Sequence, residues 1–322
     1  MSNIMRITKI ESQHNLELLR AKMESTYLKD NLLNENICVY ACGSLGRLEM
    51  IQKTDLDLFF IAINNEESEK SKIYSNLNKY IFFSDLYKIN KELGYQEPSK
   101  QGGYWDFIPK KNLLDIGSQK EDFNNSFTAR MLLILESKPI YNQNAYNDLI
   151  KAIVHKYFTD YEEHSGEFYP LFLMNDIMRY WYTLTLNYEY RRDDNDDANK
   201  KNWKRLKLKY ARLITCFSML ACLYKKNVTP DYVRNCIQIT PFERLHRISS
   251  EMNEITEVVA NIEEEYEWFL SLKSENPNWW SSIQNKTIAK EKANRFHKLV
   301  VHELMRVLSE NNPSLRDKAD VY

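Results

Sequence analysis

Two pairs of residues near the start of the chain have the types and the spacing to do phosphate chemistry. Gly43 and Ser44 directly follow an apolar run, and Asp55 and Asp57 follow after ten further residues. A Gly-Ser turn that opens a helix presents backbone N–H groups and a hydroxyl to an anion. Two aspartates that alternate with leucines on a strand point to one side of it. The first pair predicts a phosphate site, and the second predicts a site for a divalent cation.

The two pairs together indicate phosphoryl or nucleotidyl transfer. Either pair alone is a weak signal, because a Gly-Ser turn is often only a turn and an Asp-x-Asp segment is often only solvated. In such transfers, metal ions bridge the attacking and leaving oxygens while fixed donors hold the triphosphate in line. The chain has only seven glycines in 322 residues, yet Gly46 follows Gly43 by three positions. This spacing predicts backbone that turns tightly or lies close to another group.

The elements that must position these residues form a small α/β head. The apolar residues 37–42 predict a strand that ends at Gly43, and residues 56–63 predict a buried strand that begins beside the two aspartates. The same patterns predict the rest of the head: a helix within 10–33, a helix over about 66–93, a strand over 102–108 and a helix over 123–136.

From about residue 144 the strand patterns stop, and apolar residues recur at helical spacing. The predicted helices cover about 144–158, 169–192, 202–225, 230–238, 242–272 and 286–310. The sequence therefore predicts an α+β fold with two domains, residues 1–143 and an all-helical domain over residues 144–322.

The composition narrows the classes of protein. Lys and Arg number 44 against 45 Asp and Glu, which gives no sign of a nucleic-acid coat protein. Five cysteines without a CxxC pair predict buried reduced thiols rather than disulfides or a zinc site. The first residues lack the apolar core of a signal peptide, and no apolar run approaches the ~20 residues of a membrane span. We expect a cytoplasmic protein with no membrane partner.

Residues 43–58 resemble the signature of the DNA polymerase β nucleotidyltransferase superfamily. More narrowly, Gly-Ser-Leu-Gly-Arg-Leu-Glu at 43–49 and Thr-Asp-Leu-Asp-Leu at 54–58 are similar to the protein uridylyl- and adenylyltransferases of nitrogen regulation and to their uncharacterised bacterial relatives. Thr54 stands where those relatives mostly have Ser. The likeness to the uncharacterised group extends over most of residues 37–215, through the segments 102–103, 116–122, 130–136 and 175–180.

The resemblance implies a polymerase-β-like catalytic domain that uses an NTP. It implies that Gly43 and Ser44 hold the β- and γ-phosphates, and that Asp55 and Asp57 bind two Mg²⁺ (or Mn²⁺) ions. Arg47, one turn into the following helix, is then placed to bind phosphate through its guanidinium, although Arg at a helix start is also often a surface charge. Glu49 has three interpretations: it orients Arg47, it caps locally, or it is a solvated charge.

The superfamily normally adds a third carboxylate that helps to deprotonate the attacking hydroxyl. Asp106 lies in the third predicted strand, which is the expected secondary structure. Asp122 matches an acid in the resembling group, but it precedes a helix, where Asp is often only a cap. Both residues are candidate catalytic acids at this stage.

The helical domain offers candidate contacts with substrate. Asp176 and Arg179 are three apart on a helix, so they form an ion pair or face the cleft. Lys207 belongs to a run of seven positive charges within residues 200–212, which is a solvated helix face or a guide for a triphosphate or an RNA backbone. Asp176, Arg179 and Lys207 are the candidate substrate-binding residues.

These observations predict a Mg²⁺-dependent nucleotidyltransferase whose helical domain shapes the acceptor pocket. It would transfer a nucleoside monophosphate from an NTP to a protein or RNA acceptor and release pyrophosphate, as a toxin or a regulator. One alternative is synthesis of a cyclic or linear signalling nucleotide by the same chemistry. Another is a non-catalytic nucleotide-binding module, against which the aspartate pair argues.

Overall fold

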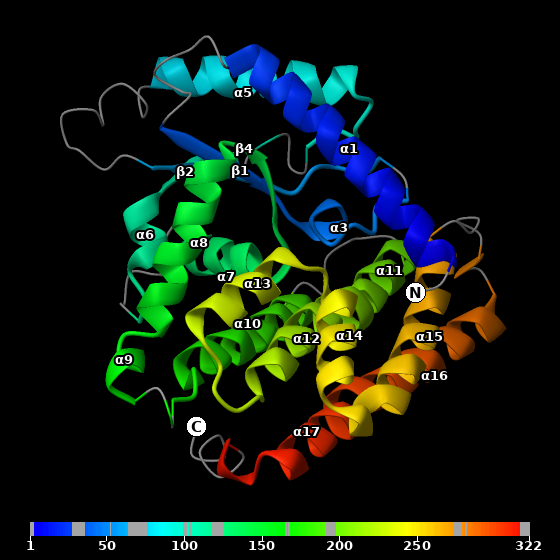
Figure 1. Ribbon diagram of the computed structural model, residues 1–322. Helices are drawn as coiled ribbons and strands as arrows, with labels where there is room; N and C mark the ends of the chain where they lie inside the picture. Colours follow the sequence, from blue (N-terminus) through cyan, green and yellow to red (C-terminus); the bar gives the residue numbers. More distant parts are fainter. Residues whose placement is uncertain are drawn as a thin grey trace. The chain divides into compact units, whose positions relative to one another are not determined.

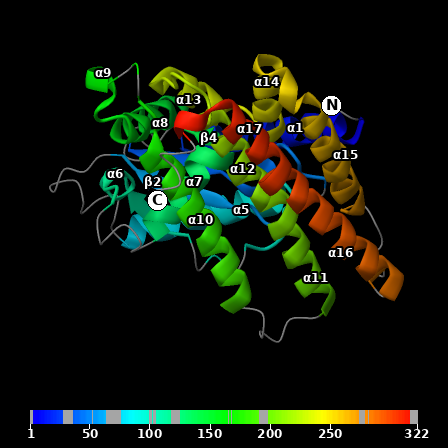
Figure 2. The same ribbon diagram turned by 90° about the horizontal axis from the view of Figure 1, so that it is seen from below.

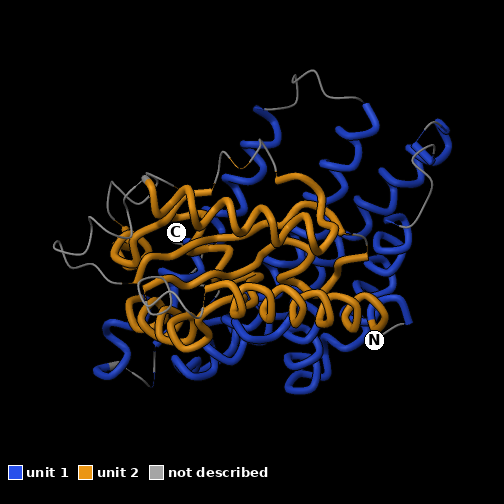
Figure 3. The backbone as a smooth tube through the Cα atoms, turned by 90° about the horizontal axis from the view of Figure 1, so that it is seen from above, with its two compact units in different colours: residues 1–5, 157–322 blue, residues 6–156 orange. Residues whose placement is uncertain are grey.

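The computed structural model describes residues 3–27, 36–51, 53–63, 76–98, 102, 105–117, 125–164, 166, 168–190, 198–273, 279–280 and 282–315. The chain divides into two compact units: the N-terminal unit, residues 6–156, and the helical unit, residues 157–322 together with residues 1–5 (Figure 3). Helix α8 (Gln143–Tyr157) begins at the predicted domain boundary, but almost all of it belongs to the N-terminal unit. The predicted functional division at residue 143 stays a prediction.

The N-terminal unit is built on a mixed four-stranded sheet in the order β3-β2-β1-β4 (Figure 1). Strand β1 (Ile37–Ala41) pairs antiparallel with β2 (Leu58–Ala62) and with β4 (Lys138–Tyr141). Strand β2 pairs parallel with β3 (Phe107–Pro109). The predicted α+β class is confirmed, although the third strand is shorter than predicted and the second begins only at Leu58.

Strand β4 was missed because its sequence contains a proline, which has no N–H to give to a ladder. Pro139 is accommodated because β4 is the last strand of the described sheet, next to β1 alone. Proline within sheets is confined largely to such edge positions. The Lys138-Pro139 pair, which predicted the end of the preceding helix, therefore also begins strand β4.

Helices cover both faces of this sheet. On one face, α1 (Asn3–Tyr27) and α5 (Asn76–Glu92) pack on a core that includes Val39 of β1 and Phe60 of β2 (Figure 1). On the other face, the hydroxyl of Tyr40 donates to the carbonyl of Ala129 in α7 (Ser126–Glu136), 2.8 Å away. Two short helices, α3 (Gly43–Gly46) and α6 (Lys110–Leu114), complete the described helices of the unit.

An aromatic cluster joins α5 to the β2–β3 side of the sheet. Phe82 lies 5.2 Å from Phe107 and 5.8 Å from Phe60 between ring centroids. Phe83, on the same helix, lies 5.1 Å from Phe60 and 5.9 Å from Trp105. Edge-to-face and tilted contacts of this kind add to the free energy gained from burial of the rings.

The helical unit has no strand among the residues that the structure describes. Its α-helices are α9 (Tyr161–His164), α10 (Leu171–Tyr190), α11 (Ala198–Lys207), α12 (Leu213–Leu223), α13 (Pro230–Gln238), α14 (Pro241–Glu251), α15 (Thr256–Leu272), α16 (Ile283–His297) and α17 (Met305–Asn311). Every residue of α12 is buried, and this helix contacts α10, α13 and α14 (Figure 2). An apolar helix inside a bundle explains why this segment has no polar face.

Several short segments among the described residues of the helical unit depart from α-helical geometry. The segment η4 (Asn253–Ile255) is a 3₁₀ turn, whereas η3 (Leu208–Arg212) and η6 (Lys298–Leu304) are π-helical. The π segments continue α11 and α16 without a break. All five cysteines are buried free thiols, as predicted. Within the described ranges, no helix is both long and apolar enough to cross a bilayer.

The aromatic cluster generates a test of the core. Phe82→Ala is expected to lower the free energy of unfolding by about 3–5 kcal/mol, because a fully buried ring is replaced by a cavity. Tyr80→Ala, on the same helix but 70% exposed, is the matched control and should change it by about 0.5 kcal/mol or less. Urea unfolding of the full chain measures both, and equal losses would contradict the packing described here.

Candidate functional site

The turn after β1 has the geometry that its glycine predicts. Gly43 follows Cys42 and starts α3 with φ of +67°, a left-handed conformation that glycine adopts without a steric penalty. The N–H of Cys42 donates to the carbonyl of Asp57, 2.8 Å away, and so ties the turn to the acidic segment. The N–H of Gly43 donates to a side chain described below and that of Gly46 to the carbonyl of Cys42, so the N–H groups of Ser44 and Leu45 are the opening donors without an intrahelical acceptor.

Both glycines of the turn lie against other groups. A Cβ atom on Gly43 would stand 2.3 Å from Oδ2 of Asp57, so the carboxylate lies directly over the glycine. A Cβ atom on Gly46 would stand 2.0 Å from the carbonyl oxygen of Glu136 and 2.9 Å from that of Ala41. The structure therefore brings the predicted phosphate turn and one predicted metal ligand together, and the spacing of the glycines reflects two close contacts.

The aspartate pair precedes β2 rather than lying within it. Leu56 and Leu58 are each 7% exposed and belong to the core below the sheet, whereas Asp57 is exposed and Asp55 is half-buried. The alternation of faces is thus as the sequence predicts. The assignment of Asp55 and Asp57 as metal ligands stays a prediction.

A buried cluster of charged side chains lies next to the turn. The Arg47 guanidinium donates from Nη1 to Oε2 of Glu136, at 2.6 Å, and from Nε to Oε2 of Glu49, at 2.9 Å. Arg47 and Glu49 are each 6% exposed, and Glu136 is 3% exposed. The other carboxylate oxygen of Glu136 accepts the N–H of Gly43 at 3.2 Å. The last residue of α7 therefore holds the glycine turn in place.

These contacts assign roles that the sequence left open. Glu49 orients Arg47, which was one of its three interpretations. The prediction that Arg47 binds phosphate stays a prediction, but the contacts described for its guanidinium are to two carboxylates, which make it a positioning residue for the turn. Sequence reasoning assigned no role to Glu136, although a carboxylate that ends an almost wholly apolar helix is a signal, because buried acids are normally paired.

Asp106 immediately precedes β3, the strand next to β2. Phe107 is paired in register with Phe60, and both belong to the core below the sheet. Trp105 packs against the same core. Alternation along an extended chain would turn Asp106 away from this core, but its observed partner, Lys79, belongs to α5, a helix that packs on the core. The Asp106 carboxylate is 66% exposed and accepts hydrogen bonds from Lys79 Nζ, at 2.5 Å, and from the N–H of Phe107, at 2.8 Å.

No third metal ligand is assembled around the pair in the part of the chain that the structure describes, since no group of three His, Cys, Asp or Glu side chains is placed to hold a metal ion there. The other candidate for the third carboxylate, Asp122, lies outside the described residues. The choice between Asp106 and Asp122 stays open at the level of geometry.

The candidate substrate contacts of the helical unit have structural partners. Asp176 is 3% exposed and accepts the Tyr157 hydroxyl at 2.5 Å. Arg179 pairs with the same carboxylate at 3.3 Å, which is the ion-pair interpretation of their spacing. Lys207 is exposed in the last turn of α11. The geometry described for Asp176 and Arg179 is that of a buried hydrogen bond and a helical ion pair, and their substrate-binding role stays a prediction.

Comparison with known proteins supports the interpretation of the turn. Residues 2–93 match the model of the family described as "Putative nucleotidyltransferase DUF294", a family of the polymerase-β-like kind. The matched segment includes Gly43, Ser44, Asp55 and Asp57, and it ends before Asp106 and the helical unit. No curated protein matches the chain. The nucleotidyltransferase resemblance is thereby confirmed for the N-terminal segment.

The buried charge cluster generates a second prediction. Glu136→Gln is expected to lower the free energy of unfolding by about 3–5 kcal/mol, because it leaves part of the Arg47 charge buried without its partner. Glu92→Gln removes an exposed ion pair with Lys22 in the same unit and should cost about 1 kcal/mol or less.

Chemical denaturation with a double-mutant cycle measures the interaction. Arg47→Met combined with Glu136→Gln should cost less than the sum of the two single variants, because neither charge is then left buried alone. Strict additivity of the two losses would contradict the cluster.

Proposed function

We propose that the chain is a divalent-metal-dependent nucleotidyltransferase that transfers a nucleoside monophosphate from an NTP to a protein or RNA acceptor and releases pyrophosphate. The observation that carries the proposal is the contact between the Gly43 turn and the Asp57 carboxylate, inside the segment that matches a nucleotidyltransferase family model. A turn with N–H donors and an adjacent acid combine the two requirements of the chemistry, a phosphate cradle and a cation site.

The donor set fits Mg²⁺ or Mn²⁺. Asp55 and Asp57 offer hard carboxylate oxygens, and Mg²⁺ in such sites is commonly bound by one or two carboxylates together with substrate phosphates. Asp57 is exposed and Asp55 half-buried, so both can be reached from solvent. When bound, the cations neutralise charge on the phosphates and lower the pKa of an attacking hydroxyl.

The side chains around the pair have separate tasks in this proposal. The hydroxyl of Ser44 and the N–H groups of Ser44 and Leu45 orient the terminal phosphates as hydrogen-bond donors, since the N–H of Gly43 is bonded to Glu136. Glu136 and Arg47 hold the turn so that its donors and Asp57 keep their spacing. Asp106, which precedes the strand next to β2, is assigned the task of accepting the proton of the acceptor hydroxyl. Asp122 is the alternative for that task.

A second candidate function is a nucleotide-binding module without catalysis. The observation that favours it is the Asp106 carboxylate, which is engaged by Lys79 and by its own neighbouring N–H rather than turned to the aspartate pair. The two functions differ in a measurable product. A module binds the NTP and leaves it intact, whereas a transferase releases pyrophosphate.

The decisive experiment incubates the full chain with each α-labelled NTP and Mg²⁺, with and without cell extract. Label in protein or RNA supports the proposed transfer, and label in a small oligonucleotide or cyclic product indicates a signalling-nucleotide synthase. Binding of an NTP without release of pyrophosphate under any condition would contradict the transferase and support the nucleotide-binding module.

Two aspartate variants test the metal pair. Asp55→Asn and Asp57→Asn are each expected to reduce label transfer to background, because the loss of one carboxylate removes charge neutralisation and positioning together. Asp85→Asn, a part-exposed acid of α5 that pairs with Lys88, is the control and should keep full activity. Asp106→Asn should lose about 100-fold or more in rate with NTP affinity retained, as expected for a general base. Activity in either pair variant would contradict the assignment.

A matched pair of glycine variants tests the close approach of the turn. Gly43→Ala and Gly94→Ala both force alanine into a left-handed conformation, with φ of +67° and +73°, at a cost of about 1–2 kcal/mol. Only the first places a Cβ atom against Asp57, because nothing lies within 4 Å of the second. Gly43→Ala should therefore abolish transfer while Gly94→Ala keeps it, at similar melting temperatures. Equal activities would show that the Asp57 contact is irrelevant to function.

A further inference from the structure

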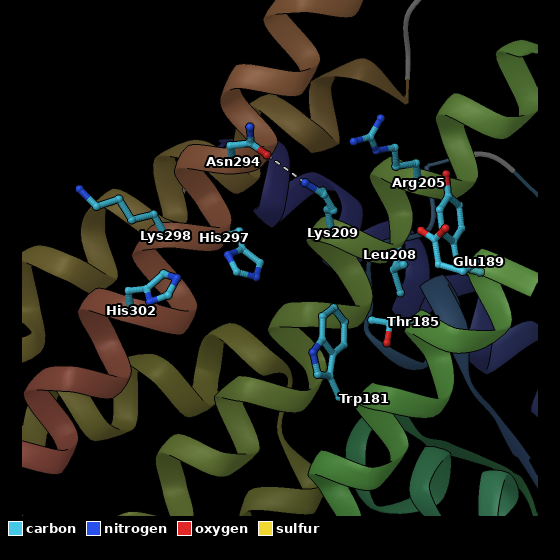
Figure 4. A pocket seen from close by; sticks show the side chains of 11 residues that line it. Trp181, Thr185, Glu189, Arg205, Leu208, Lys209, Asn294, His297, Lys298 and His302 are labelled. Atoms are coloured by element: carbon cyan, nitrogen blue, oxygen red, sulfur yellow. Dashed lines mark hydrogen bonds between the residues drawn. The ribbon is translucent and has the colours of Figure 1, made fainter. Parts of the chain in front are cut away.

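The helical unit contains a cavity of about 760 Å³ formed by three stretches of helix: α10, the junction of α11 with η3, and the junction of α16 with η6 (Figure 4). Pockets for small organic ligands generally have volumes of about 300–1,000 Å³. Every lining residue belongs to the helical unit, so the cavity exists within that unit alone.

The lining of this cavity is strongly basic. Arg205, Lys209 and Lys298 line it together with His297 and His302, and Glu189 is the acid among the lining residues. The Lys209 ammonium donates to a neutral amide oxygen, Oδ1 of Asn294, at 2.9 Å. Among the described residues, no carboxylate forms an ion pair with Arg205 or Lys209. Arg205 and Lys209 therefore bring positive charge to a concave site, whereas Lys298 pairs with Glu303 at 3.6 Å.

Burial, and after it neighbouring positive charge, lowers the pKa of two lining residues. The pKa of Lys209 is lowered by burial and by the nearby charges of Arg205 and Lys290. The pKa of His297 is lowered by burial and by Lys209 and His302. Neighbouring positive charges repel each other, and an anion that binds between them reduces this repulsion. The positive charge of Arg205 and Lys209 thus favours an anionic ligand over a cationic one.

Planar side chains form another part of the wall. Trp181 lines the cavity from α10 and is supported from behind by Phe217, with the two rings edge to face at 6.0 Å between centroids. Tyr188 lines it from the same helix. In Figure 4, Trp181 and His297 approach the same space from different helices. Aromatic faces of this kind bind planar rings by stacking.

The backbone is irregular where the cationic side chains stand. Lys209 belongs to the π-helical segment η3, and Lys298 and His302 belong to the π-helical segment η6. A π segment inserted in an α-helix is rare and is found frequently at functional sites, because its wider turn redirects side chains. Here two such segments, far apart in sequence, line one cavity.

We propose that this cavity is a binding site for a small organic phosphate with a planar ring, the chemical class of the nucleoside monophosphates. Arg205 and Lys209 bind the phosphate, and Trp181 stacks on the ring. A volume of this size suits a small molecule, as ligand pockets of about 300–1,000 Å³ do. The site goes beyond the transfer reaction proposed above, since it uses none of the residues assigned to that reaction.

Calorimetry on the full chain tests the site. The titrations use AMP, GMP, CMP and UMP in the presence of EDTA, in the Asp55→Asn/Asp57→Asn background, so that the proposed metal pair cannot contribute. At least one monophosphate should bind, and its nucleoside should bind about tenfold or more weakly, as expected from the loss of a charge-assisted contact.

Matched variants locate the binding. Arg205→Gln and Lys209→Gln should each weaken the monophosphate by about tenfold or more, whereas Lys204→Gln, an exposed neighbour on α11 outside the lining, should leave it unchanged. Trp181→Leu should weaken the monophosphate but not inorganic phosphate. Arg205 is exposed, so its variant remains informative if Lys209→Gln fails to fold.

Three results would overturn the proposal: no monophosphate binds, binding is equal in all the variants, or only an RNA oligonucleotide binds. None of them bears on transfer, because these titrations use a background in which the proposed transferase is inactive. Conversely, a failure of the labelled-NTP experiment leaves these titrations unaffected.

Discussion

The carboxylate of Glu136 is the group on which the geometry of the N-terminal unit depends. It accepts the N–H of Gly43 and the guanidinium of Arg47, and Arg47 in turn is bonded to Glu49. A buried charge is costly unless it is paired and hydrogen-bonded, so an arrangement that displaced any member would leave an uncompensated charge in the core. The turn between β1 and α3 is therefore fixed by a residue 93 positions away in sequence.

The strand that follows Glu136 extends this constraint into the sheet. Lys138 begins β4 and pairs with Ala41, the last residue of β1. The carbonyl of Glu136 also fills the space where a larger residue at 46 would need to go. On the opposite side, β2 continues the acidic segment whose Asp57 lies over Gly43. The two strands beside β1, β4 and β2, thus position the glycine turn and the acidic segment of the candidate site.

The two units use cationic side chains in opposite ways. In the N-terminal unit the cation of Arg47 is shared between two carboxylates, and the result is a rigid turn. In the helical unit, Arg205 and Lys209 line a cavity and have no carboxylate partner among the described residues. Cations that are paired with carboxylates stabilise one conformation, whereas cations without carboxylate partners attract an anionic ligand. The same residue types serve structure in one place and recognition in the other.

The sequence by itself determined the features that depend on neighbouring residues. The left-handed turn at Gly43, the alternation of Asp55 and Asp57 with buried leucines, the buried thiols and the helical character after residue 144 all follow from local conformational preference and periodicity. The segment that matches the family model, residues 2–93, contains Gly43, Asp55 and Asp57.

Only the tertiary structure decided which distant groups meet. It paired Arg47 with Glu136, placed β4 beside β1 despite its proline, and gave Asp106 the ammonium of Lys79 as a partner. It also brought two π-helical segments to one cavity. Such contacts arise from the burial of charge and apolar surface across the whole chain. Because side-chain type and spacing record only what lies within a few residues, these pairings could not be read from the sequence.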